Sequence, residues 1–132
     1  MNPSLKSAFE KWKALLGDDH VLNDEQAQRK YGANTIGSSF PFTGAIIASS
    51  QYSVQKIVQI ANEFKITIHP ISSGNNWGYG SALAPSEDQV LLDLSQLKQV
   101  IELNTDLSIV TLEPGVTQDE LHKYIEKHKL PF

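Results

Sequence analysis

The chain lacks cysteine, clustered basic residues and long apolar runs. Without cysteine, its 132 residues cannot form disulfides, thiolate metal sites, cysteine nucleophiles or a cysteinyl bond to a cofactor. Lys123, Lys127 and Lys129 are interrupted by Glu120 and Glu126. We therefore expect a solvated helix face and no nucleic-acid partner, because phosphate binding requires concentrated Lys and Arg. No run approaches the ~18 apolar residues of a membrane span, so we expect no membrane partner either.

The remaining composition is that of an ordinary globular protein. Apolar residues make up 40% and charged residues 20%, which predicts a single folded unit with a sizeable core. The first residues, Met1 to Lys13, are mixed in polarity and include Glu10, which is not typical of a signal peptide. We expect a cytoplasmic location.

We expect two parts, an N-terminal helical and loop segment at 1–44 and a domain at 45–132. In the first part, Pro3 and Gly17 bound an amphipathic helix, because Pro favours a first turn and Gly favours the position after a last turn. A shorter helix is expected near Asp24 to Lys30, and the residues after it are rich in Gly, Ser, Asn and Pro, which predicts a loop.

The second part combines one parallel unit with antiparallel strands. Ala45–Ala48 predicts a buried strand, Ser53 a helix cap and Lys65–Ile71 a second strand, which together predict a small parallel β-α-β unit. Short turns join three further strand-like runs and predict antiparallel pairing; the runs are 90–94, 99–103 and 107–112. Thr117 and Glu120 form a capping box at the start of a last helix. The predicted fold class is α+β, with helices flanking the strands.

Segment 70–81, with the sequence PISSGNNWGYGS, is uncharged and follows a predicted strand directly. Its glycines permit positive φ and a close approach of a ligand, and successive backbone N–H groups can form a nest for an anion. Segment 70–81 lacks the Lys-Ser or Lys-Thr of a P-loop, and its glycines do not match the dinucleotide pattern G-x-G-x-x-G. From these residues alone, an anion site and a tight, solvated turn are equally good interpretations.

Five stretches that follow one another along the chain favour one of these two interpretations of segment 70–81. They are AIIAS, SVQKIVQIANEFKI, HPISSGNNWGYGSA, VLLDLSQLKQVIELN and IVTLEPGVTQDELHKYIEKHKLPF. Their order and spacing resemble the FAD-binding domain shared by vanillyl-alcohol oxidase, p-cresol methylhydroxylase (4-cresol dehydrogenase) and related FAD-linked oxidases. The similarity extends over about two-thirds of the chain, from Ala45 to Phe132. The glycine-rich stretch is most similar to the phenol-oxidising branch.

The resemblance implies that FAD is the cofactor and that the glycine-rich loop holds its pyrophosphate. The candidate contacts are Ser72, Ser73, Gly74, Asn75, Asn76, Trp77, Gly78, Tyr79 and Gly80. For Trp77, packing of the loop against the core is an equal alternative. Some relatives carry a histidine in this loop that bonds covalently to the flavin. This chain has Gly74-Asn75-Asn76 there, so we expect non-covalent FAD.

Other polar residues favour structural roles. The histidines are expected to be ordinary surface or satisfied side chains, and His122 and His128 are not at the spacing of metal ligands on one helix face. Asp93 could be a catalytic carboxylate, but an acid bonded to nearby backbone is favoured. Glu113 is expected to stabilise a turn. We predict no metal site and no catalytic residue in this chain.

The resemblance implies part of an FAD-linked oxidoreductase. Its flavin would accept a hydride from a small organic substrate, such as a para-substituted phenol. Members of the family continue past Phe132 into further flavin contacts and a substrate domain. We therefore expect weak or absent FAD binding by the isolated chain, and self-association or a second chain that completes the domain. The alternative is a non-catalytic module that binds a nucleotide or partner, or a remnant without a ligand.

Overall fold

The computed structural model describes residues 3–34, 41–75, 82, 85–86 and 88–131. The elements, in chain order, are α1 (Pro3–Leu16), the 3-10 helix η1 (Asp18–His20), β1 (Val21–Leu22), α2 (Asp24–Tyr31), β2 (Gly44–Ile47), α3 (Gln51–Phe64), β3 (Ile68–Ile71), β4 (Val90–Asp93), β5 (Val100–Asn104), β6 (Ile109–Leu112) and α4 (Gln118–Lys127). None of the described helices is long and apolar enough to cross a membrane.

A four-stranded sheet has the order β1-β2-β4-β3. The strands β2, β4 and β3 run parallel, and β1 is antiparallel to β2. The predicted parallel β-α-β unit is present, but β4 lies between its two strands. The expectation that the run 90–94 pairs antiparallel with the next strand is wrong. All four residues of β4 are buried, as is usual for a central parallel strand with both faces covered.

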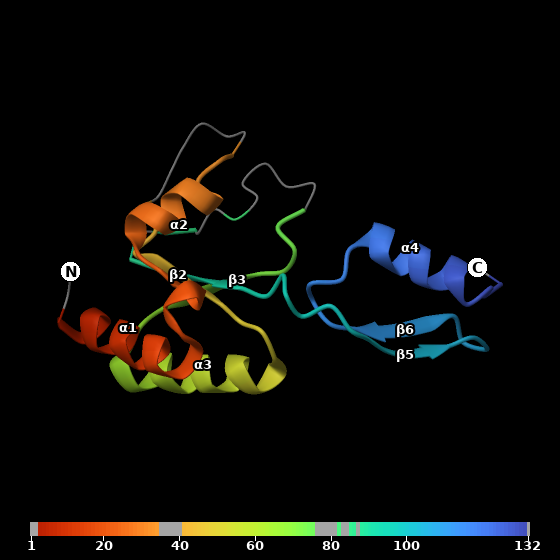
Figure 1. Ribbon diagram of the computed structural model, residues 1–132, viewed down its shortest axis with the longest axis horizontal. Coiled ribbons are helices and arrows are strands. Elements are labelled where there is room, and N and C mark those ends of the chain that lie inside the picture. The colour runs from red at the N-terminus through yellow and green to blue at the C-terminus, as the bar shows by residue number, and fades with distance from the viewer. Residues whose placement is uncertain (1–2, 35–40, 76–81, 83–84, 87, 132) are drawn as a thin grey trace.

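Helices cover both faces of this sheet (Figure 1). Successive strand residues point to opposite faces. Ile46 and Leu92 therefore join a core with α1 and α3, whereas Ala45 and Leu91 join a smaller cluster with α2. At the centre of the larger core, the indole of Trp12 is fully buried and its Nε1 donates a hydrogen bond to the Ile57 carbonyl oxygen at 3.2 Å.

Local signals set most of the helix boundaries. The expected helices α1 and α2 are confirmed, and Gly17 follows α1 with φ 88°. Ser53 is not the cap of α3: Ser50 occupies that position, and Ser53 is its capping-box partner one turn later. Lys65 ends α3 in the left-handed region with φ 57°, so β3 starts at Ile68 and not at Lys65.

The hairpin β5–β6 and α4 form a second unit beside the four-stranded sheet (Figure 1). The antiparallel pairing of β5 and β6 is confirmed, as is the capping box of Thr117 and Glu120 that begins α4. At Gly115 the backbone of the second unit comes very close to the backbone that follows β4. A Cβ at this position would lie 2.6 Å from the carbonyl oxygens of Ser95 and Leu97. Only glycine allows this backbone approach without a shift.

Candidate functional site

The candidate site lies where β3 and β4 end. Ile71 and Asp93 are register partners at the last position of these two parallel strands. Ligands of open α/β sheets bind in the crevice beyond the carboxyl ends of the strands. The glycine-rich loop starts there with Ser72, so the topology brings the predicted anion loop to the edge of the sheet that favours ligands.

A pocket of about 290 Å³ lies at this edge. Its lining comes from the end of α2 and the residue segment after it, from the loop, and from the end of β4: Lys30, Tyr31, Ala33, Ile71, Ser73, Gly74, Ala82, Asp93 and Ser95. Pockets for drug-sized ligands typically range from about 300 to about 1,000 Å³. The volume is at the lower end of this range, so the pocket can enclose part of a dinucleotide but not the whole of it.

The predicted loop residues contribute unequally. Ser73 and Gly74 line the pocket, whereas Ser72 and Asn75 are exposed. The backbone N–H of Asn75 donates to the Ser73 Oγ at 3.4 Å. Gly74 has φ 74° and no atom within 4 Å of where a Cβ would be, so glycine serves backbone conformation there and not close packing. The other predicted contacts lie outside the described residues: Asn76, Trp77, Gly78, Tyr79 and Gly80.

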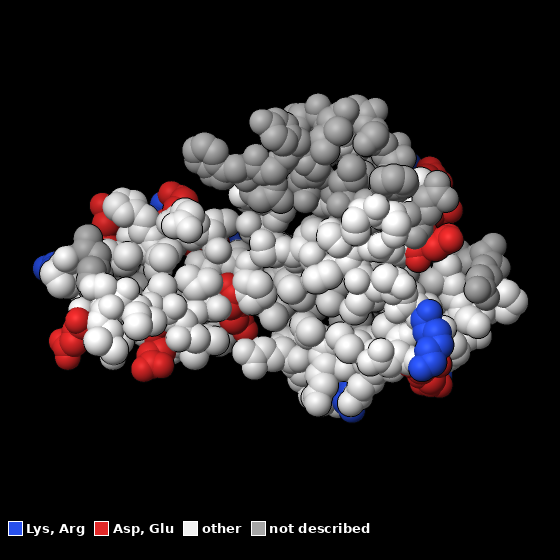
Figure 2. Space-filling model, turned by 180° about the vertical axis from the view of Figure 1, so that it is seen from behind, with Lys and Arg blue, Asp and Glu red and all other residues white. Residues whose placement is uncertain are grey.

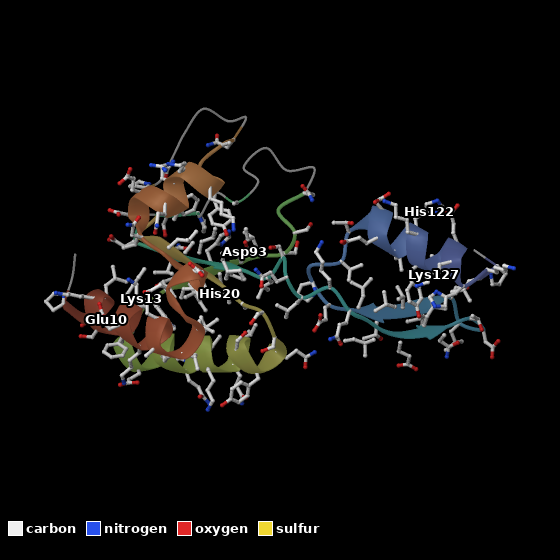
Figure 3. All side chains as sticks on the ribbon, in the orientation of Figure 1. Glu10, Lys13, His20, Asp93, His122 and Lys127 are labelled. Carbon is white, nitrogen blue, oxygen red and sulfur yellow. The ribbon has the colours of Figure 1, made fainter. Side chains whose placement is uncertain are left out.

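Asp93 is a buried carboxylate at the base of the pocket. Its Oδ1 accepts a hydrogen bond from the backbone N–H of Ser95 at 2.8 Å, and its Oδ2 accepts one from the Tyr31 hydroxyl at 2.5 Å. The predicted bond between Asp93 and nearby backbone is thus confirmed. Burial, and then the bond to Asp93, raise the pKa of Tyr31 well above its ordinary value, so this hydroxyl remains a donor. In Figure 3, Asp93 lies on the sheet next to α2, the helix that carries Tyr31.

The described lining of the pocket contains none of the four histidines. In Figure 3, His122 lies on α4 in the second unit, away from Asp93. Its side chain is largely exposed, with Nε2 3.5 Å from the Glu126 carboxylate. His69 is half-buried in β3, and burial lowers the pKa of its imidazole. Within residues 3–34, 41–75, 82, 85–86 and 88–131, no three His, Asp or Glu side chains could hold a metal ion.

The remaining acid and the surface charges have structural explanations. The Glu113 carboxylate accepts a hydrogen bond at 2.8 Å from the backbone N–H of Gln99, 14 residues earlier in the chain, so it links the two segments that flank the β5–β6 hairpin. Its role in the Pro114-Gly115 turn stays a prediction. On the face shown in Figure 2, the described Lys and Arg side chains do not gather into a patch. That face therefore offers no concentrated positive charge for phosphate binding.

The sequence interpretation missed Lys30, Tyr31 and Ser95. Ser95 could have been found, because it follows a buried strand whose carboxyl end would be expected at the ligand edge of a parallel sheet. Lys30 and Tyr31 had no such signal. They are distant in sequence from Asp93, and only the packing of α2 against the sheet brings them to the pocket.

Known proteins match this arrangement closely. Residues 42–132 match the FAD binding domain family. The chain belongs to that family. It is 36% identical to the 4-cresol dehydrogenase [hydroxylating] flavoprotein subunit of Pseudomonas putida over 94% of the chain, and 32% identical to 1'-carboxy-chondrochloren decarboxylase of Chondromyces crocatus over 92% of it. The crystal structure of p-cresol methylhydroxylase with substrate bound superposes with a TM-score of 0.90 and 34% identity over 99% of the chain.

This FAD-binding domain is short compared with its relatives. It spans 24% of the 4-cresol dehydrogenase subunit, 22% of the decarboxylase and 26% of the p-cresol methylhydroxylase chain. These matches confirm the predicted family and fold class and support FAD as the ligand. They cover only about a quarter of the proteins that carry the complete activities.

Proposed function

We propose that this chain is the pyrophosphate-binding part of an FAD-linked oxidoreductase. The observation that carries the proposal is the position of the glycine-rich loop, at the carboxyl ends of β3 and β4 and beside a pocket of about 290 Å³. The hydroxyls of Ser73 and Ser95 and the backbone at Gly74 provide neutral donors on its lining. The pocket residues therefore fit the group that the family implies.

FAD is held non-covalently and weakly in this proposal. The chain has no cysteine, and the described lining of the pocket contains no histidine. The flavin and adenosine parts of FAD extend beyond a volume of about 290 Å³, so the described pocket encloses only part of the cofactor. When FAD is bound, its flavin supplies the hydride chemistry, and the role of this chain is to bind and orient the cofactor.

The substrate of the parent enzyme is proposed to be a small para-substituted phenol. Two relatives support this class: 4-cresol dehydrogenase, and the 4-ethylphenol oxidase of Gulosibacter chungangensis, which superposes with a TM-score of 0.85 and 28% identity. Another relative with a similar domain is named for a different reaction, a decarboxylation. The substrate therefore depends on parts of the relatives that this chain does not span.

The second unit favours association with another copy of the chain. Within the described residues, β5 and β6 pair only with each other, and a groove of about 240 Å³ lies against α4. Its lining is apolar except for one serine: Leu103, Ser108, Ile109, Val110, Leu121 and Ile125. Open strand edges beside apolar surface favour pairing between chains. Sedimentation velocity should show dimers at high concentration, and a clean monomer would contradict self-association.

The cofactor proposal is tested by titration of the purified chain with FAD, followed by flavin fluorescence. The test variant is Gly74→Asp, which places a carboxylate at the loop, and the matched control is Gly74→Asn. Both side chains tolerate positive φ, so the two variants differ mainly in charge. We expect saturable binding that Gly74→Asp weakens at least about tenfold, or about 1.4 kcal/mol, and that Gly74→Asn weakens less.

Two outcomes would contradict the cofactor proposal. Of the two outcomes that the sequence leaves open, weak binding or none, the proposal commits to weak binding. Absence of any saturable binding would therefore favour the non-catalytic module, and equal binding by Gly74→Asp and the wild type would place FAD elsewhere. The non-covalent link is tested by acid precipitation of the loaded protein. The flavin should stay in the supernatant, and yellow precipitated protein would show a covalent bond.

A further inference from the structure

Lys30 is the one cationic side chain on the described lining of the pocket. It is the next-to-last residue of α2, and its side chain is 49% exposed. The Lys30 Nζ lies 3.7 Å from the Asp93 Oδ2 and 5.0 Å from the centre of the Tyr31 ring. At 3.7 Å the ammonium is an ion-pair partner of Asp93 but beyond ordinary hydrogen-bond distance.

Asp93 does not depend on Lys30 for its hydrogen bonds. Each of its oxygens already accepts one, from the Ser95 N–H and from the Tyr31 hydroxyl. Lys30 can therefore turn towards a ligand without leaving the buried carboxylate unsatisfied. The bond between Tyr31 and Asp93 also ties the end of α2 to β4, which fixes the backbone that carries Lys30.

The pocket requires a cation if it receives a diphosphate. Its other described polar groups are neutral hydroxyls and backbone, together with the carboxylate of Asp93. A negatively charged ligand next to the Asp93 carboxylate is repelled, and the repulsion is stronger than in water because Asp93 is buried. An ammonium between the phosphate and Asp93 offsets that repulsion and donates up to three hydrogen bonds.

We propose that Lys30 forms an ion pair with the diphosphate of the ligand, from its place at the end of α2. This inference rests on the proposed function and extends it, because it assigns recognition of the ligand's charge to a residue outside the glycine-rich loop. The Lys30 ammonium then bridges the buried Asp93 and the bound phosphates. The neutral donors of the loop set the shape of the site, and Lys30 supplies its affinity for negative charge.

The test compares ligands that differ in phosphate. FAD and ADP carry a diphosphate, and riboflavin carries none. The variants are Lys30→Met, Lys30→Gln and Lys30→Arg, and Arg29→Met is the matched control. Arg29 is the neighbouring residue of α2, it pairs with Glu25 at 3.0 Å, and it is absent from the pocket lining. Its substitution changes the net charge by the same amount. Circular dichroism and urea unfolding report whether each variant is folded.

Lys30→Met and Lys30→Gln should weaken FAD and ADP binding roughly three- to tenfold at low salt, because the lost contact is a half-exposed charged one. Lys30→Arg should retain most of the affinity, and Arg29→Met should leave it unchanged. Added salt should reduce the difference between the wild type and Lys30→Met, because the ion pair is screened. Riboflavin should bind equally to all variants or to none.

A second measurement uses only the wild type. The ammonium resonance of Lys30 should shift when ADP is added and should not shift with riboflavin. If the wild type binds FAD and Lys30→Met binds it with equal affinity, or if ADP does not shift the Lys30 ammonium resonance, the role of Lys30 is overturned. Either result would leave the proposed function standing. An equal loss in Lys30→Met and Arg29→Met would also overturn the role of Lys30, since it would show a general charge effect. A wild type that binds neither FAD nor ADP would overturn both this inference and the proposed function.

Discussion

The hydrogen bond between Tyr31 and Asp93 should make a measurable contribution to stability. Replacement of Tyr31 by Phe keeps the ring, which stacks edge to face with Phe42 at 6.5 Å, and removes only the hydroxyl. Asp93 then loses its 2.5 Å donor while its side chain is 4% exposed. Hydrogen bonds to charged groups contribute about 1.5–3 kcal/mol, and the half-buried position of Tyr31 lets water replace part of this one. We expect a loss of about 1–2 kcal/mol.

Urea unfolding followed by tryptophan fluorescence measures this loss. The midpoint should fall while the slope of free energy against urea stays constant. Tyr52→Phe is the control, because Tyr52 is 64% exposed, and its midpoint should match that of the wild type. Equal midpoints for Tyr31→Phe and Tyr52→Phe would refute the assigned hydrogen bond.

The same pair of proteins gives a pH test with a defined sign. Burial and the bond to Asp93 raise the folded pKa of Tyr31 above the ordinary 10.0, so the folded state retains a proton that the unfolded state releases. The advantage of the wild type over Tyr31→Phe should be complete below about pH 10 and should decrease as the pH rises above it. A difference that stays constant through this range would contradict the assigned environment of Tyr31.

Three further predictions concern packing and the second unit. Gly115→Ala should lower the free energy of unfolding by about 1–3 kcal/mol, because its Cβ would press on backbone carbonyls that cannot turn away; an unchanged urea midpoint would contradict this. Trp12→Ala should cost about 3–5 kcal/mol, measured by thermal unfolding, since the indole is fully buried; a loss below 1 kcal/mol would argue against its central position. The hydrogen bonds from Lys98 and then Thr117 lower the pKa of Glu120 from its ordinary 4.5 to about 2. The Glu120 carboxylate should therefore stabilise α4 fully above about pH 4.5, and this stabilisation should be lost as the pH falls towards 2. In an acid titration followed by circular dichroism, the difference between the wild type and Glu120→Gln should disappear over that range, and a constant difference would be the contrary result.

Local signals made the helices predictable. Pro3 and Gly17 bounded α1, and the capping box of Thr117 and Glu120 placed α4, because each signal acts within a single turn of backbone. The sequence does not distinguish Ser50 from Ser53 as the cap of α3, because both are good caps and the hydrogen bonds between them form only in the folded turn.

Sheet order was harder to predict than strand location. The run at β4 was expected to pair with the strand that follows it, because short turns favour antiparallel neighbours. Its insertion between β2 and β3 depends on contacts distant in sequence, and a strand as short as Val90–Asp93 carries no signal of direction. Burial of all four β4 residues is the one feature that suits a central parallel strand.

The candidate site also combines residues that the sequence points to with residues that it does not. The residues of the glycine-rich loop leave an anion site and a solvated turn equally open, and the family resemblance favours the anion site. The structure shows that Ser73 and Gly74 line the pocket, while their contact with a ligand stays a prediction. Lys30 and Tyr31 were not predictable, since their role arises from the packing of α2 near the end of β4. The loop carries a chemical signal in its sequence, whereas the cation that completes the pocket does not.

Ligand mapping by NMR tests most directly whether this chain binds FAD through its pyrophosphate. In uniformly labelled protein, FAD should shift the backbone amide resonances of Ser73, Gly74 and Ser95, and ADP should reproduce these shifts while riboflavin does not. The amides of β5 and β6 should stay in place apart from any effect of self-association. Shifts from riboflavin at these three amides, or no shift there with FAD, would contradict the account.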